Sequence, residues 1–499
     1  MKLLKNIKEF QPLDWALLMN AVSIMYLKAV PYFLTLLLLV LIIELIRGKV
    51  SWGNTGILVL LTLSTPILLG AIGLIVSENT SKGLEECSRL LPFFIFPVVF
   101  NFWKPKNYNF FKITALSIFA LALTIRLIYN FYESLILYNK TGETYHLFYT
   151  YFVQDINIVS IFMFFTILYI LEYYISSILS RKQLFLLIFV LVILSVSMIL
   201  LQGRIVLLGF WTALILLFFI YRKFSKKWIL LIILGVTMGA FFIPNFQSRF
   251  SKINKNLTEK SQIEVPENGE HTEKIESESM LLKTVKKHSN TLILVLSGAF
   301  LMLILYFTPF YKLAPHFLAI YLIGSMVVVF ASSKSDNFYE RTNVLVDKQE
   351  KGELFSKELS TSEKQRLNAL LTTIELIKER PLFGYGTGDW RDALTVRYYE
   401  KQLKRNFIEQ TAPHNQYLRT WLRHGAFGLL AFLAYLFWLL KKTVNHYQVG
   451  RYALVLCVIL SALGYDVFDV GGSIPFIAYF SCLLFMQTKP TIPKLDDNL

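Results

Sequence analysis

A histidine and an asparagine, His414 and Asn415, stand at the start of a long apolar stretch that runs to Leu440, after a polar segment rich in glycine and arginine. A histidine whose pKa is near neutral can take a proton from a hydroxyl group. Arg204 and Arg366 are candidates to act with it, because guanidinium groups bind phosphate through paired hydrogen bonds. Two arginines and a histidine on one side of a membrane would suit a diphosphate substrate.

Each of these residues also has a plainer interpretation. Arg204 lies in a turn of ILLQGRIVLLGFW, between two apolar stretches, where a charge is costly and a functional role is the default hypothesis. The alternative is a side chain that extends to the lipid headgroups. Both interpretations also apply to Arg126, near the outer end of another apolar stretch. Arg366 alone is typical of a solvated helix arginine. Asp466, in GYDVFDVGG, could pair with an arginine, orient His414, or be an ordinary carboxylate at a helix end.

Other motifs are less informative. The GYGTG segment at 384–388 lacks GxGxxG spacing and follows no predicted strand, which favours a turn over a phosphate-binding loop. The seven histidines are scattered without HExxH spacing, and there is no DxD motif. We therefore expect no metal and no other cofactor. His424, ten residues after His414, faces away from it on an ideal helix and is expected to be structural.

The composition indicates a membrane protein. The chain is 55% hydrophobic and 17% charged, whereas soluble proteins carry about 25% charged residues. Apolar stretches of about 20 residues recur, which predicts an all-α, polytopic membrane fold. The basic residues behind the net charge of +16 are dispersed among loops, which argues against a nucleic-acid partner. Three distant cysteines form neither a disulfide framework nor a metal cluster.

We expect 12 to 14 transmembrane helices, with ends uncertain by several residues. The fourteen candidate spans are 13–28, 31–46, 56–77, 88–103, 110–130, 156–180, 183–201, 205–222, 227–244, 291–310, 315–332, 417–440, 452–468 and 474–488. Lysine and arginine concentrate in one set of loops, as at 222–227 and 441–442, which places both termini in the cytoplasm. Arg204, Arg366 and His414 then lie outside. The N-terminus lacks a small-residue cleavage site and is expected to be a retained first helix.

The spans define the expected organisation. An N-terminal transmembrane bundle of about nine spans (1–244) precedes a polar flexible loop (245–290), an extra transmembrane pair (291–332), a periplasmic catalytic loop (333–416) and the C-terminal transmembrane helices (417–499). The catalytic loop carries a predicted amphipathic helix over 362–379. Its expected apolar face consists of Leu367, Leu370, Leu371, Ile374 and Ile377.

Three segments together resemble a known family. HNQYLRTWLRHGAFG, the upstream RLNALLTTIELIKERPLFGYGTGDW and QGRIVL are similar to motifs of O-antigen ligases and their relatives, the O-antigen polymerases and protein O-oligosaccharyltransferases. The resemblance is strong over roughly 366–430. It implies that Arg204, Arg366 and His414 are essential, with Asp466 as a fourth. The expected substrate-binding residues are Arg204, Arg366, Asn415, Arg126 and Asp466.

The resemblance also implies a reaction. A ligase of this kind takes a glycan from undecaprenyl diphosphate and transfers it without metal to an acceptor hydroxyl, such as a lipid A-core sugar. The site would face the periplasm from the bacterial inner (cytoplasmic) membrane. The acceptor, a glycolipid, a growing glycan or a protein, stays open. Family members usually have about twelve spans, so the pair at 291–332 is a departure.

A lipid-glycan transporter is the alternative of another class. A transporter would show broken helices and polar residues near the middle of the membrane. The predicted charges here collect at the external rim instead, which favours the transferase.

Overall fold

The computed structural model describes residues 9–141 except 54, 156–176, 181–201, 361–444, 449–469 and 471–486, together with residues 210, 211, 214, 233 and 234. Over this part of the chain all regular structure is helical and no residue belongs to a strand, so the all-α prediction is confirmed there. Some predicted features lie outside the described residues. They are Arg204, the loop 245–290, the pair 291–332, and most of the spans 205–222 and 227–244.

The chain divides into two compact units. The first comprises Met1–Asn130, Phe152–Ala213 and Lys357–Leu499, and the second comprises Phe131–Tyr151 and Leu214–Ser356. The helices considered below belong to the first unit, apart from the C-terminal end of α8.

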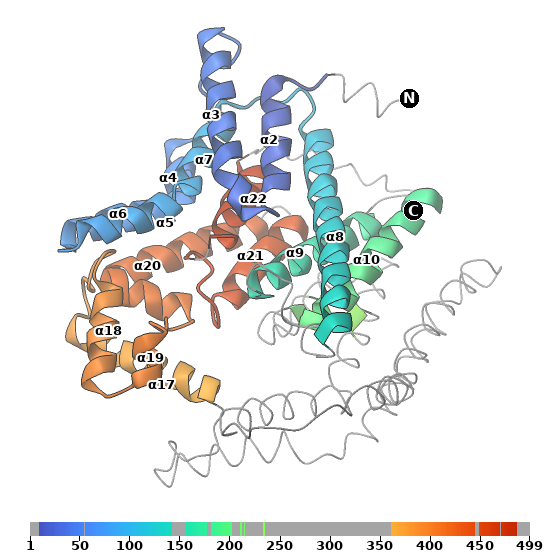
Figure 1. Ribbon diagram of the computed structural model, residues 1–499. Helices are drawn as coiled ribbons and strands as arrows, with labels where there is room; N and C mark the ends of the chain where they lie inside the picture. The colour runs from blue at the N-terminus through green and yellow to red at the C-terminus, as the bar shows by residue number, and fades with distance from the viewer. Residues whose placement is uncertain are drawn as a thin grey trace, which may run out of the picture. The chain divides into compact units, whose positions relative to one another are not determined.

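The helices follow one another along the chain as coloured in Figure 1. Before residue 202 they are α2 (Pro12–Ser23), the 3₁₀ turn η1 (Leu27–Ala29), α3 (Val30–Ile46), α4 (Ile57–Leu63), α5 (Thr65–Val76), α6 (Thr80–Arg89), α7 (Pro92–Phe102), α8 (Tyr108–Thr141), α9 (Ile156–Ser176) and α10 (Arg181–Leu201). After residue 360 they are α17 (Thr361–Glu379), α18 (Trp390–Glu400), α19 (Lys404–Ile408), α20 (Gln416–Val444), α21 (Val449–Ser461) and α22 (Ser473–Phe485).

Two described helices are long and apolar enough to cross a membrane, Tyr108–Glu133 within α8 and Gln416–Thr443 within α20. The number rises to three if the bent pair α4 and α5 counts as one span. Several shorter apolar helices, including α3, α7 and α22, accompany them. The chain is therefore a helical membrane protein, and the count of fourteen spans stays a prediction.

The predicted span 56–77 is bent. It consists of α4 and α5, which meet at Ser64 with a bend of 70°. Pro66 explains the break, because proline has no N–H to donate and its ring clashes with the preceding turn of a continuous helix. The predicted span 452–468 is too long. The helix α21 ends at Ser461, and Asp466 lies in the turn that follows it.

The centre of the described bundle is α22, in which every residue is buried. A helix that is apolar on all sides needs neighbours all round. Aromatic rings provide part of this packing. Phe476 of α22 lies 5.6 Å from the ring of Phe119 in α8 and 4.7 Å from that of Phe162 in α9, centroid to centroid. This aromatic layer joins α8, α9 and α22.

Helices α17, α18 and α19 form a small helical subdomain that precedes α20. Its core includes Leu376, Ile377, Trp390, Leu394 and Tyr398. The predicted helix 362–379 is confirmed as α17, but its predicted apolar face is only partly correct. Leu371 is exposed, whereas the buried stripe of α17 also includes the polar residues Gln365, Asn368, Thr372 and Thr373. Gln365 is buried there with hydrogen bonds to Glu409 and Thr411 of a neighbouring segment, and the Thr373 hydroxyl donates to Ala369 O of its own helix.

Candidate functional site

His414 immediately precedes the first turn of α20. Its backbone has φ +50°, in the left-handed region that residues other than glycine rarely adopt, and its side chain is half-buried. Asn415 caps the helix, since its Oδ1 accepts a hydrogen bond from the Leu418 N–H at 3.0 Å. Its Nδ2 donates to the Leu463 carbonyl at 2.9 Å. One end of the Asn415 amide therefore caps α20, and the other joins the entry of the helix to the 462–469 turn.

The 462–469 turn brings two buried carboxylates to the start of α20. Gln416 fixes it at three points, because its backbone N–H donates to Ala462 O at 3.0 Å, its Oε1 accepts from Phe468 N at 2.9 Å, and its Nε2 donates to Asp469 Oδ2 at 3.2 Å. Asp466 on this turn is buried, with 3% of its surface exposed. His414 is close enough for its positive charge to favour the ionised form of Asp466.

An ion-pair chain continues from these carboxylates along the first turns of α20. Arg419 Nη1 lies 3.1 Å from Asp466 Oδ2, and Arg419 Nε lies 3.0 Å from Asp469 Oδ2, the latter an ion pair without hydrogen-bond geometry. Arg423 Nη1 donates to Asp469 Oδ1, and Arg423 Nη2 lies 2.9 Å from Glu86 Oε2 of α6. The sequence-based interpretation that Asp466 could pair with an arginine is confirmed, and Arg419 is the partner.

The two aspartates of this chain are shifted in opposite directions. Burial raises the pKa of Asp466 above its usual value, a shift that Arg419 reduces and the neighbouring charge of Asp469 increases. Burial acts in the same direction on Asp469, but two guanidinium groups, those of Arg419 and Arg423, outweigh it and lower the pKa of that carboxyl. Asp469 is therefore the firmly ionised member, and Asp466 is the carboxyl whose charge depends on its neighbours.

Trp390, at the end of the GYGTGDW motif, is the aromatic wall of this cluster. The Arg419 guanidinium carbon lies 4.2 Å from the centroid of the Trp390 ring, within cation–π range. The indole Nε1 donates to Glu86 at 3.1 Å. A planar guanidinium held between an aromatic face and two carboxylates has little freedom to move.

The GYGTG segment itself is a structural turn, and the predicted preference for a turn is confirmed. Its N–H groups are used by the protein: Tyr385 donates to Leu422 O at 2.9 Å, Gly386 to Arg423 O at 2.8 Å, Thr387 to Gly73 O at 3.1 Å and Gly388 to Ser77 Oγ at 2.9 Å. A phosphate-binding loop would direct such donors at a ligand. This segment instead joins α5 to α20.

A break in α20 explains why the turn is needed there. Gly425 adopts φ 66° and ψ −167°, which interrupts the helix. The N–H of Ala426, which a continuous helix would direct to Leu422 O, donates instead to Pro381 O at 2.8 Å. The carbonyls of Leu422 and Arg423 accept from the GYGTG turn. In a membrane protein, backbone groups freed by a helix break are satisfied by other protein groups in this way. The predicted span 417–440 is thus a broken helix.

The break also separates the charged turns of α20 from its apolar part. Residues 426–443 would measure about 27 Å as a helix, close to the roughly 30 Å thickness of bilayer hydrocarbon. They can cross the membrane without the preceding turns that carry Arg419 and Arg423. His424, at the break, packs against Gly73 of α5, with its Nδ1 only 2.7 Å from where a Cβ on Gly73 would lie. This is the structural role expected for it.

Arg366 is exposed on α17, one residue after an anchored glutamine. Gln365 Nε2 donates to Thr411 Oγ1 at 2.7 Å, and the backbone carbonyl of Gln365 accepts from Asn406 Nδ2 at 2.8 Å. These bonds attach the start of α17 to the segment that leads into His414. The first turn of α17, which carries Arg366, is therefore bonded to the residues that precede His414, and the Arg366 side chain stays exposed.

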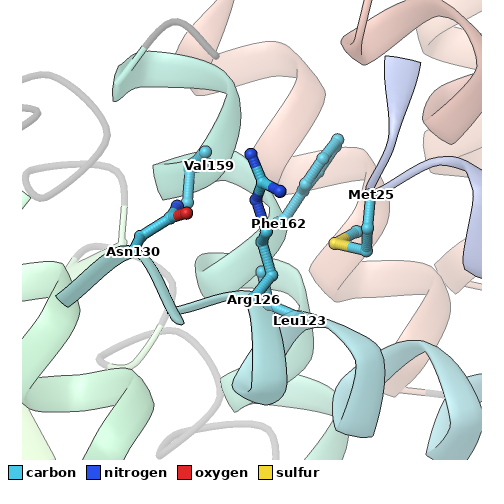
Figure 2. Close-up of a pocket in the computed structure, with 6 residues that line it drawn as sticks. All are labelled: Met25, Leu123, Arg126, Asn130, Val159 and Phe162. Atoms are coloured by element: carbon cyan, nitrogen blue, oxygen red, sulfur yellow. The ribbon is translucent and has the colours of Figure 1, made fainter. Parts of the chain in front are cut away.

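Arg126 lies in a different part of the bundle. Figure 2 shows it on α8 in a small pocket with Leu123 and Asn130, opposite Val159 and Phe162 of α9 and Met25, which follows α2. Its guanidinium carbon is 5.3 Å from the ring centroid of Tyr26 and 5.9 Å from that of Tyr129. Within the described residues this arginine is flanked by aromatic rings and is not among the ion pairs that surround His414.

Sequence reasoning did not single out Arg419, Arg423, Glu86 or Trp390. A signal was present, because Arg419 and Arg423 are four residues apart within a predicted membrane span, and intramembrane charges require partners. The partners could not be assigned, since Glu86 is more than 300 residues away in the chain. In the described part of the chain, no three His, Cys, Asp or Glu side chains gather as they would around a metal ion.

Residues 279–433 match the family described as O-antigen ligase, so the resemblance of this chain to the O-antigen ligase-like superfamily is established over that region. The matched region contains Arg366, His414, Asn415 and the arginines of α20.

A second similarity covers only a short stretch of the chain. A protein from Haemophilus influenzae, described as an uncharacterized protein, is 28% identical over 96 residues. The similar stretch covers 18% of this chain and 23% of the relative. The chain thus matches less than a quarter of that protein's length.

Proposed function

We propose that this protein is an O-antigen ligase-like glycosyltransferase of the bacterial inner membrane. It moves a glycan from undecaprenyl diphosphate to an acceptor hydroxyl, such as that of a lipid A-core sugar, on the periplasmic side. The observation that carries the proposal is the location of His414. This imidazole precedes α20 within the O-antigen ligase match, its charge acts on the buried carboxylate of Asp466, and the segment before it is bonded to α17, on which Arg366 is exposed.

The chemistry follows from these groups. His414 takes the proton of the acceptor hydroxyl as its oxygen attacks the anomeric carbon of the donor sugar. The bond from that carbon to the diphosphate oxygen breaks, and undecaprenyl diphosphate leaves with the electron pair, which inverts the anomeric centre. Arg204 and Arg366 bind the diphosphate and stabilise its developing charge. The step balances without a metal or other cofactor.

The remaining predicted residues have supporting roles. Asp466 favours a protonated His414 after the transfer. Asn415 fixes the helix entry that aims the imidazole. Arg126, in its apolar and aromatic pocket, is suited to a phosphate group close to a hydrocarbon chain. Membrane lipids surround the helices, and the donor reaches the site from the bilayer.

Contacts between distant segments agree with a site on one side of the membrane. The Asp389 carboxylate, which follows GYGTG, accepts from the Glu78 and Asn79 N–H groups at 2.7 and 2.8 Å, and Lys82 Nζ lies 2.6 Å from Asp392. The segment after α5 and the segment before α18 therefore share one side of the membrane. The orientation rule assigns both to the periplasm, with the N- and C-termini in the cytoplasm.

Broken helices are also found in transporters, which keeps a lipid-glycan transporter as the second candidate. The specific observation is the pair of breaks, at Ser64 and Gly425. In transporters, backbone groups at such breaks coordinate the cargo. At Gly425 these groups bond instead to the 381–386 segment, which favours the transferase.

The test is the glycan phenotype of a strain lacking this protein, complemented with the wild type or with His414→Ala at matched membrane abundance. Lipopolysaccharide is separated on a gel, with a glycoprotein stain alongside. Loss of the ladder with accumulation of lipid-linked polymer would identify a ligase, and core with a single repeat would identify a repeat-unit polymerase. Loss of protein glycosylation alone would identify a protein O-oligosaccharyltransferase. A His414→Ala strain that behaves as wild type would refute the catalytic role.

A further inference from the structure

Arg419 is one of the most constrained side chains in the described structure. It is five residues after His414 on α20 and only 5% exposed. Its guanidinium contacts Asp466 at 3.1 Å, Asp469 at 3.0 Å and the Trp390 ring at 4.2 Å. Buried ion pairs seldom increase stability over apolar packing of the same volume. The contacts of Arg419 are therefore better explained by the orientation that they give to neighbouring side chains than by a gain in stability.

The consequence of this contact is seen at Asp466. Arg419 occupies only the Oδ2 atom of that carboxylate. The other oxygen, Oδ1, is buried and has no hydrogen-bond partner among the described residues. A buried acceptor without a donor costs roughly 1–3 kcal/mol, so such an atom marks a place where a donor is expected. His414 is the titratable group whose positive charge acts on Asp466 from the entry of α20.

We propose that Arg419 is a positioning residue, which keeps Asp466 ionised and directs its free oxygen toward His414, and so sets the basicity of that imidazole. The inference rests on the proposed function only in calling His414 the base. It assigns a role to a residue outside the predicted set of His414, Arg204 and Arg366.

The sign of the effect follows from the groups that face Asp466. Burial and the neighbouring Asp469 favour the neutral carboxyl, whereas Arg419 and His414 favour the ionised carboxylate. Without Arg419, two of these influences oppose ionisation and only the imidazole supports it. The pKa of Asp466 then rises further, and His414 loses its negative partner. His414 should therefore give up its own proton at a lower pH.

The experiment measures His414 directly in the purified full-length protein. Diethyl pyrocarbonate reacts with an imidazole only in its neutral form, and the extent of modification of His414 itself is followed by peptide mass spectrometry from pH 5 to 9. Arg419→Gln is expected to lower the pH midpoint of modification by about one unit, the scale of a nearby charge. Asp466→Asn should lower it equally, and the double variant no further.

Arg423→Gln is the matched control, because it removes a buried guanidinium from the same helix that contacts Asp469 and Glu86 but not Asp466. Its midpoint should equal that of the wild type. Additive shifts of Arg419→Gln and Asp466→Asn, or no shift for Arg419→Gln, would overturn the proposal. If Arg419→Gln does not accumulate, Arg419→Lys is used and should give a smaller shift in the same direction.

The readout does not depend on transferase activity. An inactive wild type with the expected midpoints would refute the proposed function and keep the positioning role. An active wild type, together with a pH midpoint of His414 modification that is unchanged in Arg419→Gln, would keep the proposed function and refute the positioning role.

Discussion

Replacing Gly425 with alanine should destabilise the protein more than a helix glycine ordinarily would. The structure gives two independent reasons. The first is conformational, because φ 66° with ψ −167° belongs to a region that only glycine adopts without strain, at a cost of about 1–3 kcal/mol for another residue. The second is steric. A Cβ at this position would lie 2.0 Å from Leu382 O and 2.3 Å from Phe383 N, which are backbone atoms.

The steric conflict determines the magnitude. To relieve it, the 381–386 segment must move away from α20, which breaks the bonds from Ala426 N to Pro381 O and from Tyr385 N to Leu422 O. Each such bond contributes about 1 kcal/mol. Together with the conformational cost, the expected loss is about 4 kcal/mol, nearly a thousandfold in the folding equilibrium.

The assay is equilibrium unfolding of the purified protein in mixed micelles, followed by tryptophan fluorescence. Trp421, whose Nε1 donates to Pro381 O at 3.0 Å, reports on this contact. The control is Gly56→Ala, since an added Cβ there meets nothing within 4 Å, and its cost should stay under about 1 kcal/mol. Equal stabilities for the two variants would show that α20 is not broken at Gly425.

The other predictions concern the charged groups. Asp469→Asn should cost roughly 3 kcal/mol, because Arg419 and Arg423 lose a shared buried partner; an unchanged unfolding midpoint would contradict this. The pKa of Asp469 is lowered by folding, so its contribution is present above the ordinary carboxyl pKa and is lost as the pH falls through the folded value. Wild-type stability should therefore decline toward low pH more steeply than that of Asp469→Asn. Arg366→Ala should abolish glycan transfer but keep the free energy of unfolding within about 0.5 kcal/mol of wild type, because the side chain is exposed. A variant that loses stability together with transfer would indicate a structural role. Transfer should survive EDTA, and a loss that added metal restores would refute the metal-independent mechanism.

Much of the fold could be predicted because it depends on local pattern. Apolar runs identified α3, α9 and α10 almost to their ends, and helical periodicity placed α17 within one residue of its observed start. The breaks were harder to predict. Pro66 was a visible signal for the first, but Gly425 is compatible with both a continuous and a broken helix. Its conformation depends on the backbone of Leu382, more than 40 residues earlier, and no local pattern contains that contact.

The site residues that could be predicted are those whose place beside an apolar run is visible in the sequence. His414 and Asn415 precede an apolar run, and Asp466 ends another, so each could be named from its position. The partner of Asp466 could not, because an arginine in α20 meets it only when the 462–469 turn folds back on the helix. Arg204 lies outside the described residues, and its role remains a prediction from sequence.

The break at Gly425 and the ion-pair chain have complementary functions. Packing in the lipid-embedded turns of α20 cannot orient His414, because the helix is interrupted between them and the imidazole. The first turns need another constraint, and the ion pairs provide it by joining α20 to the 462–469 turn through Asp469 and to α6 through Glu86. An apolar cluster could hold these turns as tightly, but it would leave Asp466 without the charge that keeps it ionised. The cost of burying these charges is therefore best understood as the cost of orienting the His414 imidazole and setting its basicity.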